Sequence, residues 1–167
     1  PIECQLITEM LDDRDSYLAC TGMPIETAKT AQKNVSGFIS ALIKQGHNLF
    51  QIPYVITCDA TTSRSKCWEG RVPTMTKGQA QGFWITDRGR RMNVKEMMRL
   101  QGMNPEEFTL EITERQLAQQ LGNAMSLNVL ERIMHRLLPS AGFDVKEKDD
   151  RWESGKAASD LANSRNG

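Results

Sequence analysis

The chain has 167 residues, which suits one compact domain with a tail or a part of a larger protein. Hydrophobic residues make up 39% and charged residues 25%, so a collagen-like or wholly disordered chain is excluded. No stretch approaches the roughly 18 consecutive apolar residues of a membrane span, and no signal peptide precedes the first apolar segment. The chain begins with Pro1 rather than Met, so we expect a processed chain or a piece of a longer one.

The formal net charge of zero hides an uneven distribution. Residues 61–100 contain nine basic and three acidic residues, whereas residues 1–60 contain four basic and seven acidic ones. A segment with a net charge of +6 is typical of a surface that binds a polyanion such as nucleic acid. A solvated positive face with no partner is the alternative at this point.

The cysteines do not indicate a metal site or a nucleophile. They are Cys4, Cys20, Cys58 and Cys67. None belongs to a C-x-x-C pair, and both histidines lie too far away in the sequence to complete a zinc pattern. The low cysteine content favours a reducing, intracellular compartment, and we expect four inert thiols and no bound metal.

The first half of the chain predicts one helix and one strand. Within residues 1–25 we expect a short apolar segment, which ends at Leu11, and then an acidic loop at 12–15. Over residues 30–45 the apolar side chains recur on one face, and Gly46 is placed to end the helix. Residues 49–57 are rich in β-branched and aromatic residues, and Pro53 predicts an edge strand or a bulge.

A small β unit follows. A polar loop over residues 59–70 leads to two strand-like pieces, 72–76 and 83–86, and residues 87–89 read as a turn. The connecting loops are basic and contain glycine. We therefore expect a small irregular sheet over residues 49–92.

From residue 93 onward the pattern is helical. Asn93 with Glu96 and Thr113 with Gln116 each have the spacing of a capping box, which opens helices at 93–101 and 113–121. Residues 122–124 interrupt the second helix. A third, amphipathic helix runs from about residue 126 to Pro139 with its leucines on one stripe, and we expect the apolar and methionine side chains of these helices in a core.

Two motifs in the second half resemble one family, the DNA cytosine-5 methyltransferases. Residues 90–108 read R-R-M-N-V-K-E-M-M-R-L-Q-G-M-N-P-E-E-F. They are similar to the family's ninth conserved block, R-R-L-T-x-x-E-x-x-R-L-Q-G-F-P-x-x-F. Residues 119–125, Q-Q-L-G-N-A-M, resemble the tenth block, Q-x-G-N-[SA]-V. Residues 72–76 and 82–85 resemble the stretch that closes the family's target-recognition region.

The resemblance implies an α+β fold in three parts. Residues 1–92 would be the target-recognition region, which binds DNA, and residues 93–143 the helical C-terminal part of the methyltransferase domain. Residues 144–167, polar and poor in large apolar residues, are expected to be a disordered tail. The C-terminal helices would complete an α/β domain that binds S-adenosylmethionine.

Several blocks that the family's chemistry needs are absent from these 167 residues. The chain has no Pro-Cys nucleophile, no Glu-Asn pair, no Gln-x-Arg-x-Arg segment and no glycine-rich cofactor loop. In the family these blocks lie N-terminal to the two that are present. We therefore expect a C-terminal part that has no catalytic residue of its own and is inactive alone. Its partners would be double-stranded DNA and the missing N-terminal catalytic half, on the same or a separate chain.

The resemblance and the charge pattern together nominate site residues. The DNA-binding candidates are the basic and amide side chains of the +6 segment together with one threonine: Arg64, Lys66, Arg71, Thr76, Lys77, Gln79, Gln81, Arg88 and Arg90. The residues that would wall the S-adenosylmethionine pocket are Gly122, Asn123, Ala124 and Met125. Glu96, Arg99 and Arg91 are expected to form internal polar contacts.

Two other functions remain open from the sequence. The helices at 93–101 and 113–138 could act as a helix-turn-helix in a non-catalytic DNA-binding module, although the first helix has few polar side chains for base edges. A degenerate remnant without activity is the other possibility. In each case that involves DNA, we expect the protein inside the cell with the DNA, in the nucleus if the source is eukaryotic.

Overall fold

The computed structural model describes residues 10–11, 28–49, 51–79, 82–144 and 150–164. Its centre is a four-stranded antiparallel sheet in the order β2-β1-β3-β4. The strands are β1 (Tyr54–Thr57), β2 (Cys67–Glu69), β3 (Phe83–Ile85) and β4 (Arg90–Arg91). The helices are α2 (Lys29–Lys44), α3 (Val94–Leu100), α4 (Glu114–Leu121), α5 (Leu127–Ser140) and α6 (Lys156–Asn163), with short 3₁₀ turns η1 (Lys77–Gln79) and η2 (Pro105–Glu107). The mixture of helices with a small antiparallel sheet is an α+β arrangement, as the sequence predicts.

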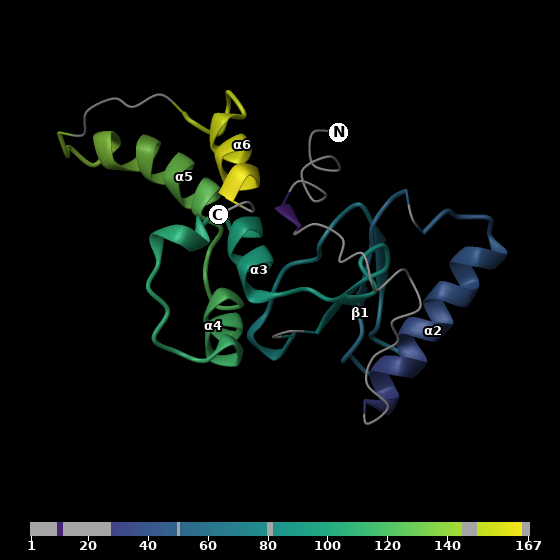
Figure 1. The fold of residues 1–167 in the computed structure, drawn as a ribbon. Coiled ribbons are helices and arrows are strands. Elements are labelled where there is room, and N and C mark those ends of the chain that lie inside the picture. The colour runs from purple at the N-terminus through teal and green to yellow at the C-terminus, as the bar shows by residue number, and fades with distance from the viewer. Residues whose placement is uncertain (1–9, 12–27, 50, 80–81, 145–149, 165–167) are drawn as a thin grey trace.

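The sheet separates two groups of helices (Figure 1). Successive side chains of a strand point to opposite faces, so β1 contributes to two cores. Ile56 packs with Ala31 and Val35 on the α2 side, whereas Val55 packs with residues of α3 and α4 on the other side. The sheet is therefore covered on both faces, and both cores depend on the same four-residue strand.

Helix α2 follows the predicted periodicity closely. Ala31, Val35 and Leu42 are buried, and Gly46 lies two residues after the helix with φ +80°, a conformation that favours glycine. The side-chain amide of Asn34 donates to the carbonyl oxygens of Cys58 and Ala60, both at 2.8 Å. These bonds attach the first half of α2 to the loop that leaves β1.

Helix α3 is held by a buried carboxylate. Asn93 Oδ1 accepts from the Glu96 backbone N–H at 2.8 Å and Glu96 Oε2 accepts from that of Asn93 at 2.8 Å, so the predicted capping box is confirmed. The Arg90 guanidinium donates to both Glu96 oxygens, at 2.9 and 2.7 Å. Because Glu96 is fully buried, this ion pair joins β4 to α3 away from solvent.

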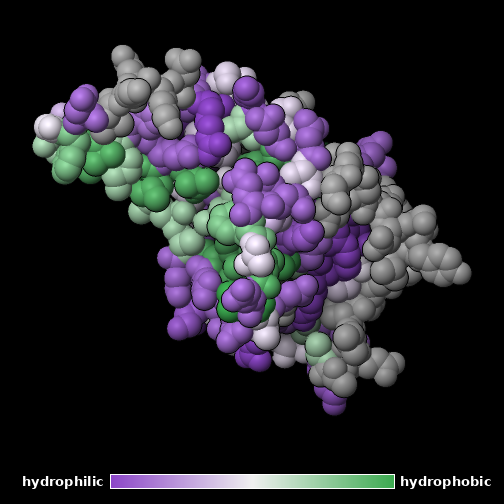
Figure 2. Space-filling model, turned by 60° about the vertical axis from the view of Figure 1, so that its left-hand side comes forward, coloured by the Kyte–Doolittle hydropathy of each residue, from purple (hydrophilic) through white to green (hydrophobic). Residues whose placement is uncertain are grey.

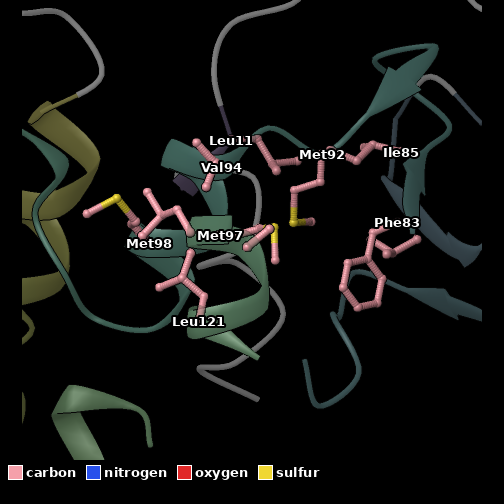
Figure 3. Close-up of a cluster of buried hydrophobic side chains, with 11 residues drawn as sticks. Leu11, Phe83, Ile85, Met92, Val94, Met97, Met98 and Leu121 are labelled. Carbon is pink, nitrogen blue, oxygen red and sulfur yellow. The ribbon is translucent and has the colours of Figure 1, made fainter. Parts of the chain in front are cut away.

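Methionines fill the space between the sheet and the helices. Met92, Met97 and Met98 converge with Leu11 and Leu121 in one cluster (Figure 3). The predicted use of these methionines as core is confirmed. Thioether side chains are flexible enough to fill the irregular gap between a short twisted sheet and two helices.

Two strand predictions are wrong. Residues 72–76 form no strand; Pro73 lacks a ladder donor, and Val72 and Met75 instead pack on the edge of the methionine core. Strand β1 is an interior strand and not an edge, because Pro53 precedes it and uses only its carbonyl oxygen, which accepts from the Gly70 N–H at 2.8 Å.

The C-terminal segment also differs from the prediction. Instead of a disordered tail over residues 144–167, the described part contains helix α6, whose Ala157, Leu161 and Ala162 are buried. These apolar residues recur at helical spacing, and the high overall polarity of the segment masks them. Helix α5 forms as predicted, but its expected core stripe is exposed: Leu137 is 53% and Met134 37% exposed, and no residue of α5 is buried.

The Arg90–Glu96 pair predicts a large stability effect. Glu96→Gln keeps a side chain that can cap α3 but leaves the Arg90 charge without its carboxylate, so we expect a loss of about 3 kcal/mol in the free energy of unfolding. Glu106→Gln removes the exposed Lys95–Glu106 pair and serves as the control, with a loss below about 1 kcal/mol. Urea denaturation of both variants measures the difference, and equal losses would contradict the prediction.

Candidate functional site

One glutamine joins the two sequence blocks that the motif comparison singled out. Gln101, at the end of α3, donates from Nε2 to the Leu121 carbonyl oxygen at 3.0 Å and accepts at Oε1 from Ser126 Oγ at 2.7 Å. Its own carbonyl oxygen accepts from the Leu127 N–H at 2.8 Å. We name these three bonds the Gln101 clamp. Residues 122–125, the bend between α4 and α5, are thereby held at both ends by one residue.

Gly122 brings the bend against the loop that precedes β3. A Cβ atom at this position would overlap the backbone of Thr76 and Lys77 far inside van der Waals contact. The φ of Gly122 is −69°, which every residue type can adopt, so space and not backbone conformation requires the glycine. The predicted cofactor residue Gly122 therefore has a packing role that joins the bend to the basic loop.

The next three residues of the bend form surface. Asn123, Ala124 and Met125 are exposed, Met125 by 57%. Ala124 lines two hollows: one of about 560 Å³ shared with residues 70–75 and one of about 480 Å³ shared with the extended segment 108–112. Of the four predicted cofactor residues, Ala124 and Met125 thus line a hollow, and Asn123 is exposed beside them.

The structure divides the predicted DNA-binding residues between the two ends of the sheet. Arg64 and Lys66 are exposed in the loop that leaves β1 at Thr57. Gln79 lies at the same end, because its carbonyl oxygen accepts from the Gly82 N–H, and the Gly82 carbonyl accepts from Cys58, each at 2.9 Å. Thr76 and Lys77 are exposed beside it, and Thr76 Oγ1 donates to Gln79 Oε1 at 3.1 Å.

Arg71 lies at the opposite end of the sheet. Arg71 follows Gly70, whose N–H donates to the carbonyl oxygen of Pro53, just before β1. The Arg71 side chain is exposed. Gln81 lies outside the described residues. The predicted patch is therefore one group of residues 64, 66, 76, 77 and 79, which we name the basic loop group, with Arg71 apart from it.

Two predicted phosphate contacts are turned inward. Arg88 is only 9% exposed and pairs with the buried carboxylate of Asp87, and Arg90 pairs with Glu96 as described above. A guanidinium that neutralises an internal carboxylate adds little net charge to the surface, so these two arginines do not form part of a DNA-facing surface. The expected internal contacts of Glu96, Arg99 and Arg91 are confirmed: Arg99 Nε donates to the Met10 carbonyl oxygen at 2.8 Å.

Arg91 forms a second ion pair beside a buried thiol. It donates to both Asp59 oxygens at 2.7 Å and to Cys58 Sγ at 3.2 Å. The hydrogen bonds to Asp59 raise the pKa of the Arg91 guanidinium. Burial raises the pKa of the Cys58 thiol to about 12 and that of Cys67 to about 11. Neither thiol forms the thiolate that a nucleophile needs near neutral pH.

Motif matching alone does not show what Gln101 does. It stands inside the matched L-Q-G run, which marks it as a motif residue. Its partners Leu121, Ser126 and Leu127 are 20 or more positions away in the sequence. Helix α3 is also unsuited to a DNA groove, because five of its seven residues are buried: Val94, Glu96, Met97, Met98 and Arg99. Helix α3 therefore does not have the exposed face that the recognition helix of a helix-turn-helix needs.

Two further site classes have no support among the described residues. No group of three or more His, Cys, Asp or Glu side chains is arranged to hold a metal ion there. No helix in the same part of the chain is both long and apolar enough to cross a bilayer.

A sequence model of one family matches most of the chain. The family is described as C-5 cytosine-specific DNA methylase, and the match covers residues 9–138. The chain belongs to this family. No curated protein and no solved structure matches the chain significantly. The family suggests cytosine methyltransferase activity, and the clamp and the glycine contact lie within the matched residues.

Substitution of Gly122 and of Gly37 by alanine makes a matched test of the packing contact. We expect Gly122→Ala to lower the free energy of unfolding by about 1–3 kcal/mol, because the methyl group meets rigid backbone of residues 76–77. Gly37→Ala places its methyl group where no atom lies within 4 Å and should leave stability unchanged or raise it by up to about 1 kcal/mol. Thermal and urea unfolding measure both, and a Gly122→Ala variant as stable as Gly37→Ala would refute the contact.

Proposed function

We propose that this chain is the part of a DNA cytosine-5 methyltransferase that recognises the DNA and closes the cofactor pocket. The observation that carries the proposal is the joint position of the bend at 122–125. The Gln101 clamp ties the bend to the ninth block, and Gly122 sets it against the basic loop group. A unit of this kind can respond to DNA and cofactor together.

The reaction that we propose is methyl transfer to C5 of a cytosine that has been flipped out of the duplex. A stacked and paired base hides its reacting atom, so the enzyme has to extrude it and hold the distorted DNA. The resemblance places the nucleophile on a Pro-Cys cysteine, and none of the 167 residues forms that pair. We therefore assign the nucleophile to a separate catalytic half, on the same or another chain.

The exposed residues of the bend suit one wall of an S-adenosylmethionine pocket. The cofactor would supply the methyl group as an electrophile. The Asn123 amide makes no hydrogen bond to a described residue and can serve a polar edge, while the Ala124 and Met125 side chains offer apolar contact. Such a mixture of apolar surface with few polar groups is typical of a small-molecule site.

The basic loop group is our proposed DNA contact. Arg64, Lys66 and Lys77 are exposed cations at one end of the sheet and suit phosphate oxygens. Thr76 and Gln79 lie between them with hydroxyl and amide groups that can reach base edges. Gln81 belongs to the same loop in sequence, and Arg71 would make a separate phosphate contact.

An apolar surface formed by residues of α5 and of the segment 108–112 is our proposed dock for the catalytic half. Figure 2 shows hydrophobic residues extending from α5 toward the middle of this face. The exposed members are Phe108, Leu110, Ile112, Val129, Ile133, Met134 and Leu137. A contiguous apolar area of this kind is typical of an interface that is covered in the complete protein. The complete enzyme would work inside the cell, where the DNA is.

Activity should require both halves. We expect the purified 167-residue chain to transfer no label from methyl-labelled S-adenosylmethionine to DNA, because it has no Pro-Cys pair to supply the nucleophile and no glycine-rich cofactor loop. Addition of a polypeptide with the family's Pro-Cys and glycine-rich blocks should restore transfer. Methylation by the chain alone would contradict the proposal.

Substitutions in the proposed dock test whether complementation depends on this surface. Ile133→Asp and Leu137→Asp change side chains that are 47% and 53% exposed, so the chain should fold normally and lose complementation by at least tenfold. Ile52→Asp changes a side chain that is 42% exposed before β1 and should retain complementation. Equal activity of all three variants would place the dock elsewhere.

DNA binding should depend on the basic loop group. We expect Arg64→Gln, Lys66→Gln and Lys77→Gln each to weaken duplex binding and to lower the slope of log affinity against log salt by about 0.9. Lys156→Gln, on α6, is the matched control because it removes the same charge far from the loops. Fluorescence anisotropy over a salt series measures the slopes. If the control changes the slope as much as the loop variants do, the contact is not local.

A further inference from the structure

Helix α2 has an outward face with a single chemical character. At about 100° per residue, five exposed residues fall within an arc of about 80°. They are Lys29, Lys33, Ser36, Ser40 and Lys44. The buried Ala31, Val35 and Leu42 lie on the opposite side of the helix, against the sheet. The five residues therefore point away from the rest of the described molecule, and we name them the α2 face.

Helix α2 itself contains no carboxylate. The sequence has no Asp or Glu between Glu26 and Asp59, and three lysines lie in α2. None of the three forms an ion pair with a residue that the structure describes. A face of ammonium and hydroxyl groups without carboxylates is complementary to a polyanion, and phosphates accept hydrogen bonds from both group types.

Gly37 is a second and independent feature of the same face. It lies in the middle of α2 at the border of the α2 face, where glycine costs about 1 kcal/mol relative to alanine. A Cβ atom there would have no described residue within 4 Å, so packing against the described part of the chain does not require glycine. A partner whose backbone approaches the helix closely does require it.

Helix α2 is attached to the chain segment that leads to the basic loop group. Asn34 attaches the first half of α2 to Cys58 and Ala60, at the start of the loop that carries Arg64 and Lys66. The second half packs through Leu42 at the other end of β1, near Tyr54. From the first to the last lysine the helix rises about 22 Å, over which one DNA strand carries about six phosphates.

We propose that the α2 face binds the sugar-phosphate backbone of double-stranded DNA, as a second contact beside the basic loop group. The inference rests on the proposed function and adds residues 29, 33, 36, 37, 40 and 44 to its DNA surface. The lysines neutralise phosphates, the Ser40 hydroxyl donates to a phosphate oxygen, and Gly37 leaves room for the backbone. These contacts carry no base information, so the face adds affinity and register and leaves sequence choice to the loops.

The test measures binding of the 167-residue chain to a fluorescent duplex over a salt series. The triple variant Lys29→Gln, Lys33→Gln, Lys44→Gln should lower the salt slope by about 2.7 and weaken binding at least tenfold at low salt. Glutamine has a helix propensity close to that of lysine, so circular dichroism should show an unchanged helix content. Arg115→Gln, Arg136→Gln, Lys156→Gln together remove three exposed cations from α4, α5 and α6 and should change the slope by less than 1.

Gly37→Ala separates DNA contact from helix stability. The variant should unfold at the same or a higher temperature and yet bind the duplex several-fold more weakly, with the salt slope unchanged. Binding as tight as that of the parent chain would overturn the close approach at Gly37. A lysine triple variant that binds like the control triple would overturn the α2 face as a DNA contact.

The loop variants distinguish failure of this inference from failure of the proposed function. If the Arg64, Lys66 and Lys77 variants lose affinity and the lysine triple variant does not, the loop contact stands and the α2 contact falls. If the parent chain binds no duplex at any salt concentration, both fall. If the lysine triple variant loses binding to single-stranded RNA but not to the duplex, the face has a different polyanion as its partner and the inference is overturned.

Discussion

The geometry of the site depends on the side-chain amide of Gln101. Gln101 is 5% exposed, and its side-chain amide uses its donor on one side of the bend and its acceptor on the other. An unpaired buried amide costs free energy, so the helix end, the bend and the start of α5 are favourable only in this one arrangement. The contact of Gly122 with the loop at 76–77 then follows from where the bend is held.

The platform behind this clamp combines one charged contact with an adaptable core. The Arg90–Glu96 pair is directional and fixes how β4 meets α3, whereas the methionines have no strict geometry and fill the remaining space. Such a division suits a lobe that has to keep its site geometry while its outer faces meet other molecules. Helix α5, which carries the exposed apolar stripe, and helix α2, which carries the lysines, lie on opposite sides of this platform (Figure 1).

Local patterns predicted helices α2, α3, α4 and α5 well because the causes of these helices are local, whereas α6 was missed. The capping boxes at Asn93 and Thr113 and the stop at Gly46 involve residues within four positions of one another. The partners of Arg88 and Arg90 could not be predicted in this way, since a count of positive charges does not show which of them meet internal carboxylates. The stripe of α5 has the periodicity of a core helix, and periodicity does not show whether the covering partner is in the same chain. In the site, the motif located the bend, but only the structure shows why its glycine is needed.

Three glycines show how one residue type carries three different kinds of information. Gly102 has φ +82° and lies against Trp152, so conformation and space both require it. Gly122 has an ordinary φ and lacks space, which makes it a marker of contact within the chain. Gly37 has neither restriction. In the middle of a helix it lowers the free energy of unfolding relative to alanine, and no contact with a described residue compensates for this loss. For Gly37, conformation and contact with the described residues are both excluded, and our proposal assigns the glycine to the close approach of a partner. The lysines of α2 indicate that this partner is negatively charged, as the DNA backbone is.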